Sequence, residues 1–143
     1  MQAYESPVVL RWSDMDPNFH IRHSVYYDLG AQQRTQYLIE HGLSPAVMGK
    51  YKFGPILFRE EAVFKKEIHF GDTLTINVAV VSIRKDYSRW TMRHQILRGE
   101  DVCAEITVDG AWIDTEKRKL TSPPEFAINV FEKMPRTEDF RWM

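Results

Sequence analysis

Three consecutive segments in the second half of the chain alternate apolar and polar residues with a period of two. These segments are residues 73–82, 87–97 and 102–113. Residues 56–68, just before them, follow the same pattern less regularly. Successive side chains of a β-strand point to opposite faces of the sheet, so the alternation predicts antiparallel strands with one covered face. The charged or glycine-containing segments 69–72, 84–86 and 98–101 predict the turns that join these strands.

One long helix is expected before these strands, from about Ser24 to about His41. Ser24 stands where an N-cap hydroxyl would accept a bond from a free amide of the first turn, and Gly42 stands where a glycine often ends a helix. One face of this helix carries four residues at helical spacing, Tyr26, Gly30, Gln33 and Tyr37. Apolar residues cover much of the remaining surface, so the helix is expected to be surrounded by other parts of the fold.

The expected order of elements is a short strand at 8–12, a polar loop, the helix and then four strands. This order predicts the α+β class, with an antiparallel sheet of about five strands curled round one long central helix. The 143 residues suit a single domain that covers 1–143. Residues 42–55 are expected to form a loop, and residues 121–143 an irregular segment or a short helical cap. Long unpaired edge strands favour the pairing of two sheets in a dimer.

Composition and charge argue against several functions. The net charge is −1 and the sequence has no basic stripe, so neither a nucleic acid nor a membrane surface is expected as a partner. Cys103 is the only cysteine, which excludes an intramolecular disulfide and a cysteine zinc cage. No metal and no separate cofactor is expected. The start of the chain is too polar for a signal peptide and no apolar run reaches membrane-spanning length, so a cytoplasmic location is expected.

Residues 13–23 carry more reactive side chains than a simple connection needs. Asp14, Asp16 and His20 follow the spacing Asp-x-Asp-(x)3-His, and His23 lies directly before the expected helix. An aspartate can attack a carbonyl carbon or activate a water molecule. The first backbone N–H groups of a helix are unpaired and lie at the positive end of its dipole, so the N–H of His23 or Ser24 could bind a developing oxyanion.

This segment resembles the N-terminal signature of hot-dog acyl-CoA thioesterases of the 4-hydroxybenzoyl-CoA thioesterase type. That signature is an arginine-aromatic-x-Asp-x-Asp run, then Gly-His-Val-Asn-Asn, then a tyrosine that opens the helix; residues 11–26 here read RWSDMDPNFHIRHSVY. Residues 70–72 (FGD) also match the turn before the central strand of that family. Two departures affect the substrate class more than the fold: Phe19 replaces the usual glycine, and residues 22–23 (RH) replace two asparagines.

The resemblance implies a hot-dog fold and the hydrolysis of acyl-CoA or acyl-carrier-protein thioesters to a free acid and a thiol, in a homodimer or homotetramer. It assigns the role of nucleophile or general base to Asp16. Coenzyme A would be part of the substrate rather than a bound cofactor. The other residues expected at the site are His20 and His23 for catalysis, Phe19, Ser24 and Tyr26 for substrate binding, and Glu61 as a reserve catalytic carboxylate.

Each of these residues also has a structural interpretation. Asp16 can form an Asx-turn, and Asp14 can brace the loop through its own hydrogen bonds. His20 can make a structural hydrogen bond instead of orienting Asp16 or polarising a carbonyl. Glu61 can lie on an exposed strand face, paired with a neighbouring basic side chain. His94 lies in an alternating apolar segment and is expected to be a hydrogen-bonded core histidine.

Coenzyme A carries a diphosphate and a 3′-phosphate, so basic residues are expected near the entrance of the site. Six are available at strand ends and turns, and none is assigned: Lys65, Lys66, Arg84, Lys85, Arg89 and Arg93. Two other functions remain open. Residues 14–20 partly resemble the Asp-x-Asn-Pro-x-His run of hot-dog enoyl-CoA hydratases and dehydratases. The same fold can also serve a non-catalytic module for acyl-CoA binding or assembly.

Overall fold

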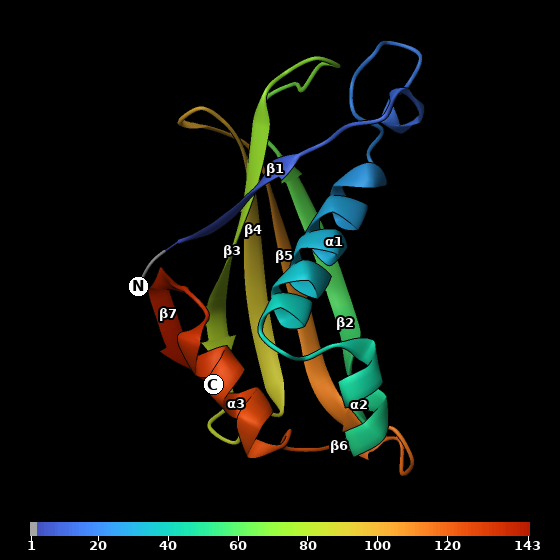
Figure 1. Ribbon diagram of the computed structural model, residues 1–143. Helices are drawn as coiled ribbons and strands as arrows, with labels where there is room; N and C mark the ends of the chain where they lie inside the picture. Colours follow the sequence, from blue (N-terminus) through green and yellow to red (C-terminus); the bar gives the residue numbers. More distant parts are fainter. Residues whose placement is uncertain (1–2) are drawn as a thin grey trace.

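A computed structural model describes residues 3–143 of the chain (Figure 1). The elements in chain order are β1 (Tyr4–Val8), the short 3-10 helix η1 (Trp12–Asp14), α1 (Val25–Glu40), α2 (Pro45–Tyr51), β2 (Phe53–Phe64), β3 (Leu74–Ile83), β4 (Arg89–Arg98), β5 (Asp101–Asp114), β6 (Lys119–Leu120), α3 (Glu125–Lys133) and β7 (Arg136–Trp142). None of the helices within residues 3–143 has the length and apolar character needed to span a bilayer.

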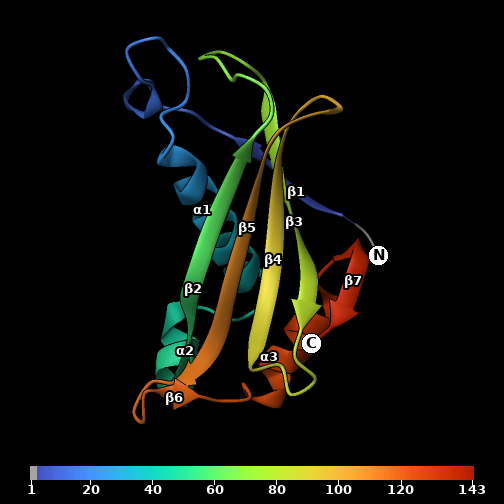
Figure 2. The ribbon, with the colours of Figure 1, turned by 180° about the vertical axis from the view of Figure 1, so that it is seen from behind.

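The strands form one sheet whose main order is β1-β3-β4-β5-β2, and every neighbouring pair along this order is antiparallel. β6 adds a short antiparallel pairing to β5, and β7 pairs with β3 in parallel. The sheet curls round α1, and all three helices lie on the same side of it (Figure 1 and Figure 2). The structure confirms the α+β class and the central helix predicted from the sequence.

β3 and β4 bury every second residue, as their alternation predicts. Ile76 and Val78 of β3 and Ile96 of β4 are among the least exposed side chains on this face. Burying an aliphatic side chain of this size stabilises the fold by roughly 1.5–3 kcal/mol. The hydrophobic core therefore lies between this covered face of the sheet and α1.

The buried face of α1 carries a polar network as well as apolar side chains. The four residues predicted to share this face are all buried: Tyr26, Gly30, Gln33 and Tyr37. Gln33 Nε2 donates to the carbonyl oxygen of Ile76 at 2.6 Å, and His94 Nδ1 donates to Gln33 Oε1 at 2.9 Å. Arg34 Nη1 donates to His94 Nε2 at 3.0 Å. A Cβ atom on Gly30 would lie 3.1 Å from His94 Cδ2, so glycine allows this close approach. His94 is the hydrogen-bonded core histidine that the sequence predicts.

The first strand lies earlier than the sequence predicts. β1 covers Tyr4–Val8 rather than residues 8–12, and Val9 is exposed. The Asp14 carboxylate accepts hydrogen bonds from the backbone N–H and the guanidinium of Arg11, at 2.9 and 2.8 Å. These bonds fold the chain into η1 and turn it away from the sheet, so the strand cannot continue.

β2 also differs from its prediction, because it covers Phe53–Phe64 instead of 56–68. It pairs with β5 and lies at the opposite edge of the main sheet from β1. The predicted turn at 69–72 is present, with Gly71 at a φ of +99°. This turn does not close a hairpin, since the connection carries the chain across the sheet to β3 (Figure 1).

Two segments are more regular than predicted. Residues 42–55 include α2. Residues 121–143 form α3, which agrees with the expected short helical cap, and β7, which was not predicted. α2 begins with a proline after the N-cap Ser44, whose Oγ accepts the N–H of Val47 at 3.2 Å. β7 has the sequence RTEDFRW, in which no apolar alternation marks a strand.

The ends of α1 agree with the sequence in part. Gly42 has a φ of +87°, the left-handed backbone conformation that ends helices at glycine. Ser24 does not cap the helix with its side chain, because its own backbone is already helical, with φ −72° and ψ −22°. Its Oγ instead accepts a hydrogen bond from Arg22 Nε at 3.2 Å. The predicted N-cap bond of Ser24 is therefore wrong.

Candidate active site

The loop between η1 and α1 closes on itself through hydrogen bonds around Asp16. Its backbone N–H donates to the carbonyl oxygen of His20 at 2.8 Å. Its Oδ1 atom accepts the backbone N–H groups of Asn18 and His20, at 2.9 and 3.1 Å, which forms an Asx-turn. Within residues 3–143 no hydrogen bond is made to Oδ2. One carboxylate oxygen of Asp16 thus fixes the loop, and the other is free to act.

Phe19 adopts a backbone conformation that usually belongs to glycine. Its φ is +59°, and its side chain is 69% exposed. The position is the one at which the hot-dog thioesterase signature has glycine. Phe19 therefore combines a left-handed turn of the loop with an exposed ring at its tip. This ring does not line the cavity described below.

Asp14 braces the start of the loop, as its structural interpretation predicts. It is buried, and its carboxylate binds Arg11 through two side-chain bonds and one backbone bond. The hydrogen bond from the Arg11 side chain, followed by that from its backbone, lowers the pKa of Asp14 below its usual range. The backbone N–H of Arg22 also donates to the carbonyl oxygen of Asp14 at 2.8 Å. Asp14 therefore holds both ends of the loop that carries Asp16.

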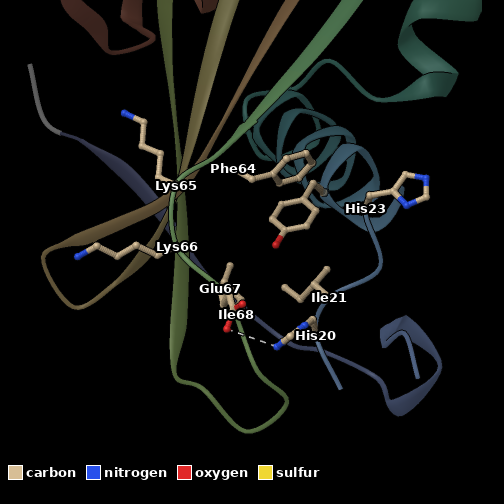
Figure 3. A pocket seen from close by; sticks show the side chains of 9 residues that line it. His20, Ile21, His23, Phe64, Lys65, Lys66, Glu67 and Ile68 are labelled. Carbon is tan, nitrogen blue, oxygen red and sulfur yellow. Dashed lines mark ion pairs between the residues drawn. The ribbon is translucent and has the colours of Figure 1, made fainter. Parts of the chain in front are cut away.

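A cavity of about 330 Å³ lies between this loop and the segment that follows β2 (Figure 3). The lining residues are His20, Ile21, His23, Tyr26, Phe64, Lys65, Lys66, Glu67 and Ile68. Three predicted site residues, His20, His23 and Tyr26, are thus brought together. The other four do not line the cavity: Asp16, Phe19, Ser24 and Glu61. Asp16 is nevertheless bonded to the backbone of His20, which does.

Tyr26 and Phe64 both line this cavity, and their rings meet edge to face at a centroid distance of 4.8 Å. Burial raises the pKa of the Tyr26 phenol. The phenol therefore stays protonated at neutral pH and can donate a hydrogen bond.

Two backbone N–H groups at the start of α1 have no acceptor in the described part of the chain. They belong to His23 and Ser24, whereas the N–H of Val25 donates to the carbonyl oxygen of Arg22 at 2.9 Å. Both groups lie at the positive end of the helix dipole, where they can stabilise a negative oxygen. His23 also lines the cavity, so these donors lie close to it.

Lys65 and Lys66 are the only members of the six predicted basic residues that line the cavity. Their Nζ atoms form ion pairs with Glu105 at 2.5 Å and with Asp101 at 3.0 Å. Figure 3 shows both side chains extending away from His20 and His23. The lysines therefore form the rim of the cavity.

Glu67 and His69 were not predicted as site residues, yet they lie beside His20. His20 Nε2 is 3.1 Å from His69 Nε2 and 3.6 Å from Glu67 Oε2. A β-bridge joins the backbones of His20 and His69, which are 49 positions apart in sequence. The sequence does not show this bridge. The one feature that could have pointed to Glu67 and His69 is the presence of side chains able to ligate a metal ion after β2.

Glu61 lies away from this cavity, on an exposed part of β2. Its Oε2 atom is 2.7 Å from Arg59 Nη2 on the same strand. This arrangement matches the structural interpretation of Glu61, which is an exposed strand face with a neighbouring basic partner. The geometry gives no support to its role as a reserve catalytic carboxylate.

A second cavity of about 170 Å³ lies farther along α1 and is lined mainly by apolar side chains. Its lining residues are Ala31, Arg34, Thr35, Leu38, Pro55, Leu57, Trp90, Met92, Trp112, Phe131 and Met134. The indole Nε1 atoms of Trp90 and Trp112 are buried and have no hydrogen-bond partner within residues 3–143. Burial lowers the pKa of the Arg34 guanidinium, whose Nη2 atom is 4.0 Å from Glu60 Oε2.

A sheet curled round one central helix, with an acidic loop and a cavity at the start of that helix, defines the hot-dog class of proteins. Several solved structures have the same fold as this chain. A Staphylococcus aureus protein in complex with CoA aligns with a TM-score of 0.83 and 16% identity over 95% of this chain and 88% of its own. A 1,4-dihydroxy-2-naphthoyl-CoA thioesterase from Synechocystis gives a TM-score of 0.76 and 19% identity over 92% and 95% of the two chains. A DHNA-CoA thioesterase from Staphylococcus aureus gives a TM-score of 0.80 and 16% identity over 93% of this chain and 91% of its own.

The sequence itself matches the family model of the thioesterase-like superfamily over residues 10–131. No curated protein matches the sequence at a significant level. The family match covers most of the chain and includes both the acidic loop and the strands from β2 to β6. The chain therefore belongs to the thioesterase-like superfamily, a family of thioester hydrolases, and the resemblance seen in the sequence is confirmed.

Proposed function

We propose that the protein hydrolyses acyl-CoA or acyl-carrier-protein thioesters to a free acid and a thiol, with Asp16 as nucleophile or general base. The observation that carries this proposal is the state of the Asp16 carboxylate. Oδ1 is held by two backbone N–H groups, while Oδ2 has no partner within residues 3–143. A carboxylate that is fixed by one oxygen and open at the other suits attack on a carbonyl or on a water molecule.

The oxyanion that forms from the thioester carbonyl needs donors near Asp16. The backbone N–H groups of His23 and Ser24 have no acceptor within residues 3–143 and lie at the positive end of α1. Fixed donors of this kind stabilise a transition state by about 3 kcal/mol each. Asp16 is bonded to the backbone of His20, and one of the two amides belongs to His23; both histidines line the cavity. We therefore place the reacting carbonyl between the loop and the first turn of α1.

The shape of the cavity favours a compact acyl group. Its volume of about 330 Å³ lies at the lower end of ligand-binding pockets. Ile21, Tyr26, Phe64 and Ile68 give it an apolar wall with two aromatic rings. We propose that Lys65 and Lys66, at the rim of the cavity, bind the phosphates of CoA. Two of the similar structures are thioesterases named for aromatic acyl-CoA substrates, which agrees with this assignment.

We also propose that the protein is a homodimer built through β2. This strand is 12 residues long and lies at the edge of the main sheet order. Its exposed apolar side chains are Leu57, Phe58, Val63 and Phe64. A long apolar edge strand attracts another strand, and a two-fold axis lets two copies of the same edge pair. A partner subunit would thus cover this surface.

The direct test is thiol release from a panel of acetyl-, hexanoyl-, palmitoyl- and benzoyl-CoA by the wild type, Asp16→Asn and Glu61→Gln. The amide oxygen introduced by Asp16→Asn can still accept the two backbone bonds, so the loop should keep its fold. We expect Asp16→Asn to lower kcat/KM by at least about 100-fold, because it removes the base or nucleophile. We expect Glu61→Gln to keep wild-type activity, since Glu61 pairs with Arg59 outside the cavity.

Other outcomes would point elsewhere. Full activity in Asp16→Asn together with its loss in Glu61→Gln would move the catalytic role to Glu61. If the wild type releases no thiol from any substrate, hydrolysis is wrong. Enoyl-CoA hydration and acyl-CoA binding without turnover would then be measured next.

A further inference from the structure

Three side chains that can ligate a metal ion converge at the edge of the cavity: His20, Glu67 and His69. His20 Nε2 is 3.1 Å from His69 Nε2, and the two nitrogens are 3.6 and 3.7 Å from Glu67 Oε2. They come from the loop before α1 and from the connection between β2 and β3. Figure 3 shows the His20 ring directed toward the Glu67 carboxylate.

These three atoms form a triangle of the size that a tetrahedral metal ion needs. Zinc binds imidazole nitrogen at about 2.0–2.1 Å and carboxylate oxygen at about 2.0–2.2 Å. Ligand atoms at tetrahedral angles and these bond lengths lie about 3.3–3.5 Å apart. The observed separations of 3.1, 3.6 and 3.7 Å bracket that range. An ion therefore fits with shifts of only a few tenths of an ångström.

Backbone bonds already hold the three residues in place. The N–H of Phe70 donates to the carbonyl oxygen of Phe19 at 3.2 Å, on one side of the bridge between His20 and His69. The N–H of His69 donates to Asp72 Oδ2 at 2.9 Å. The two segments are therefore joined without an ion, so binding would not have to order a flexible loop.

The donor set indicates the class of ion. Two imidazoles and one carboxylate suit zinc and similar divalent transition metals, whereas magnesium and calcium prefer oxygen ligands alone. The side chains of His20, Glu67 and His69 are 32%, 72% and 53% exposed, so solvent reaches the site. A water molecule can complete the coordination, as in zinc sites with three protein ligands.

We propose that His20, Glu67 and His69 bind one divalent transition-metal ion of the zinc class. Without the ion, one imidazole donates its Nε2 proton to the other Nε2 atom. With the ion, both Nε2 atoms coordinate through their lone pairs and both rings carry the proton on Nδ1. The ion then links the Asp16 loop to the connection after β2. This proposal departs from the prediction of no metal site, and it does not depend on the proposed hydrolysis.

The test is isothermal titration of chelator-treated protein with zinc chloride, for the wild type, His69→Gln, Glu67→Gln and His41→Gln. His41 is exposed, stacks on Tyr37 and lies at the far end of α1, so it serves as the matched histidine control. Circular dichroism before titration checks that each variant is folded. The thermal unfolding midpoint, measured with and without zinc, gives a second readout that does not involve activity.

We expect the wild type and His41→Gln to bind one zinc ion and to gain thermal stability from it. Loss of a partner that only orients a metal ligand costs about 10–100-fold in affinity. We therefore expect His69→Gln, which removes a ligand, to bind at least about 100-fold more weakly, and Glu67→Gln to be weakened as well. The proposal is overturned if the wild type does not bind zinc, or if folded His69→Gln binds it as tightly as the wild type.

Discussion

Phe19 keeps a left-handed backbone conformation at a φ of +59°, in spite of its Cβ atom. A residue with a Cβ atom costs about 1–2 kcal/mol in this region, and glycine avoids this cost at some loss of chain entropy. The surrounding hydrogen bonds of Asp16 and Phe70 hold the conformation in place. Strain of this kind persists where neighbouring contacts hold the backbone in the unfavourable conformation, and it is common at functional sites.

Two substitutions at position 19 distinguish the cost of the backbone conformation from the contribution of the aromatic ring. Phe19→Gly and Phe19→Ala both remove the aromatic side chain, and they differ only in the Cβ atom. We expect Phe19→Gly to have a free energy of unfolding about 1 kcal/mol higher than Phe19→Ala. Urea denaturation of the two variants measures this difference. Equal stability would mean that the loop changes its conformation when the ring is lost.

His94 makes the stability of the protein depend on pH. Burial, together with the positive charge of Arg34, lowers the pKa of His94 to about 3. A histidine in the unfolded chain has a pKa of about 6.5. Between these two pKa values, the unfolded chain binds a proton at His94 that the folded chain does not. The free energy of unfolding should therefore fall as the pH is lowered from about 6.5, by up to about 1.4 kcal/mol per pH unit.

Denaturant titrations between pH 7 and 5 measure this slope. Carboxylates with lowered pKa values, of which Asp14 and Asp72 are two, contribute mainly at lower pH, because unfolded aspartates titrate at about 3.9. His94→Gln replaces the imidazole by an amide, which can still form hydrogen bonds but does not titrate. We expect a flatter dependence in this variant. A variant as steep as the wild type would assign the pH dependence to another residue.

The residues of the site differ in how far the sequence could reveal them. Asp16, His20 and His23 lie within one short segment before a helix, so their proximity followed from spacing alone. Glu67 and His69 join them through a β-bridge across the connection after β2. That bridge depends on where β2 lies in the sheet, and local patterns in the sequence do not encode strand order.

At the scale of the elements, two serines before helices behave differently. Ser44 has extended backbone angles, and its Oγ accepts the N–H of Val47. Ser24 has helical angles, and its side chain makes no capping bond. The sequence favours both positions equally, since serine is a preferred N-cap residue. The backbone conformation decides which hydroxyl reaches an amide.

Alanine substitutions at these two positions test the difference. We expect Ser44→Ala to lower the free energy of unfolding by about 1 kcal/mol, because an amide of α2 loses its acceptor. We expect Ser24→Ala to change it by less than about 0.5 kcal/mol, as for other exposed positions. Thermal or urea unfolding measures both. Equal losses in the two variants would contradict the assignment of the cap bonds.

The central elements followed from sequence patterns more closely than the peripheral ones. β3, β4 and β5 alternate in polarity because one face of each is covered, and the pattern records that burial directly. β7 has a largely polar sequence and packs at the margin of the sheet, so its strand conformation depends on pairing with β3. Such a strand leaves no periodic signal.

At the scale of the whole molecule, the proposed dimer can be tested on the surface of β2. Val63 on this strand and Leu120 on β6 are both 46% exposed. We expect Val63→Lys to shift the molecular mass in solution from dimer toward monomer, because it places a charge on the strand through which the proposed dimer forms. We expect Leu120→Lys to remain a dimer. Light scattering coupled to gel filtration measures both masses.

The matched lysine variant distinguishes the proposed edge from a general effect of added charge. A wild-type protein that is monomeric at micromolar concentration would contradict the proposed dimer directly. Dissociation of both variants would place the contact outside β2. Either result would leave the fold and the assignment of Asp16 unchanged, because neither depends on the mass in solution.

The pairing of β7 with β3 bears on how further strands could add to the sheet. Along β3, the outer edge is occupied by β1 over residues 74–78 and by β7 over residues 80–83. The side of the sheet away from β2 is thus closed by short strands from the two ends of the same chain. In the proposed dimer, pairing through β2 would use the long edge of each copy, and we expect strand addition to end at two copies. We therefore expect that β7, by occupying part of the edge of β3, limits the addition of further strands.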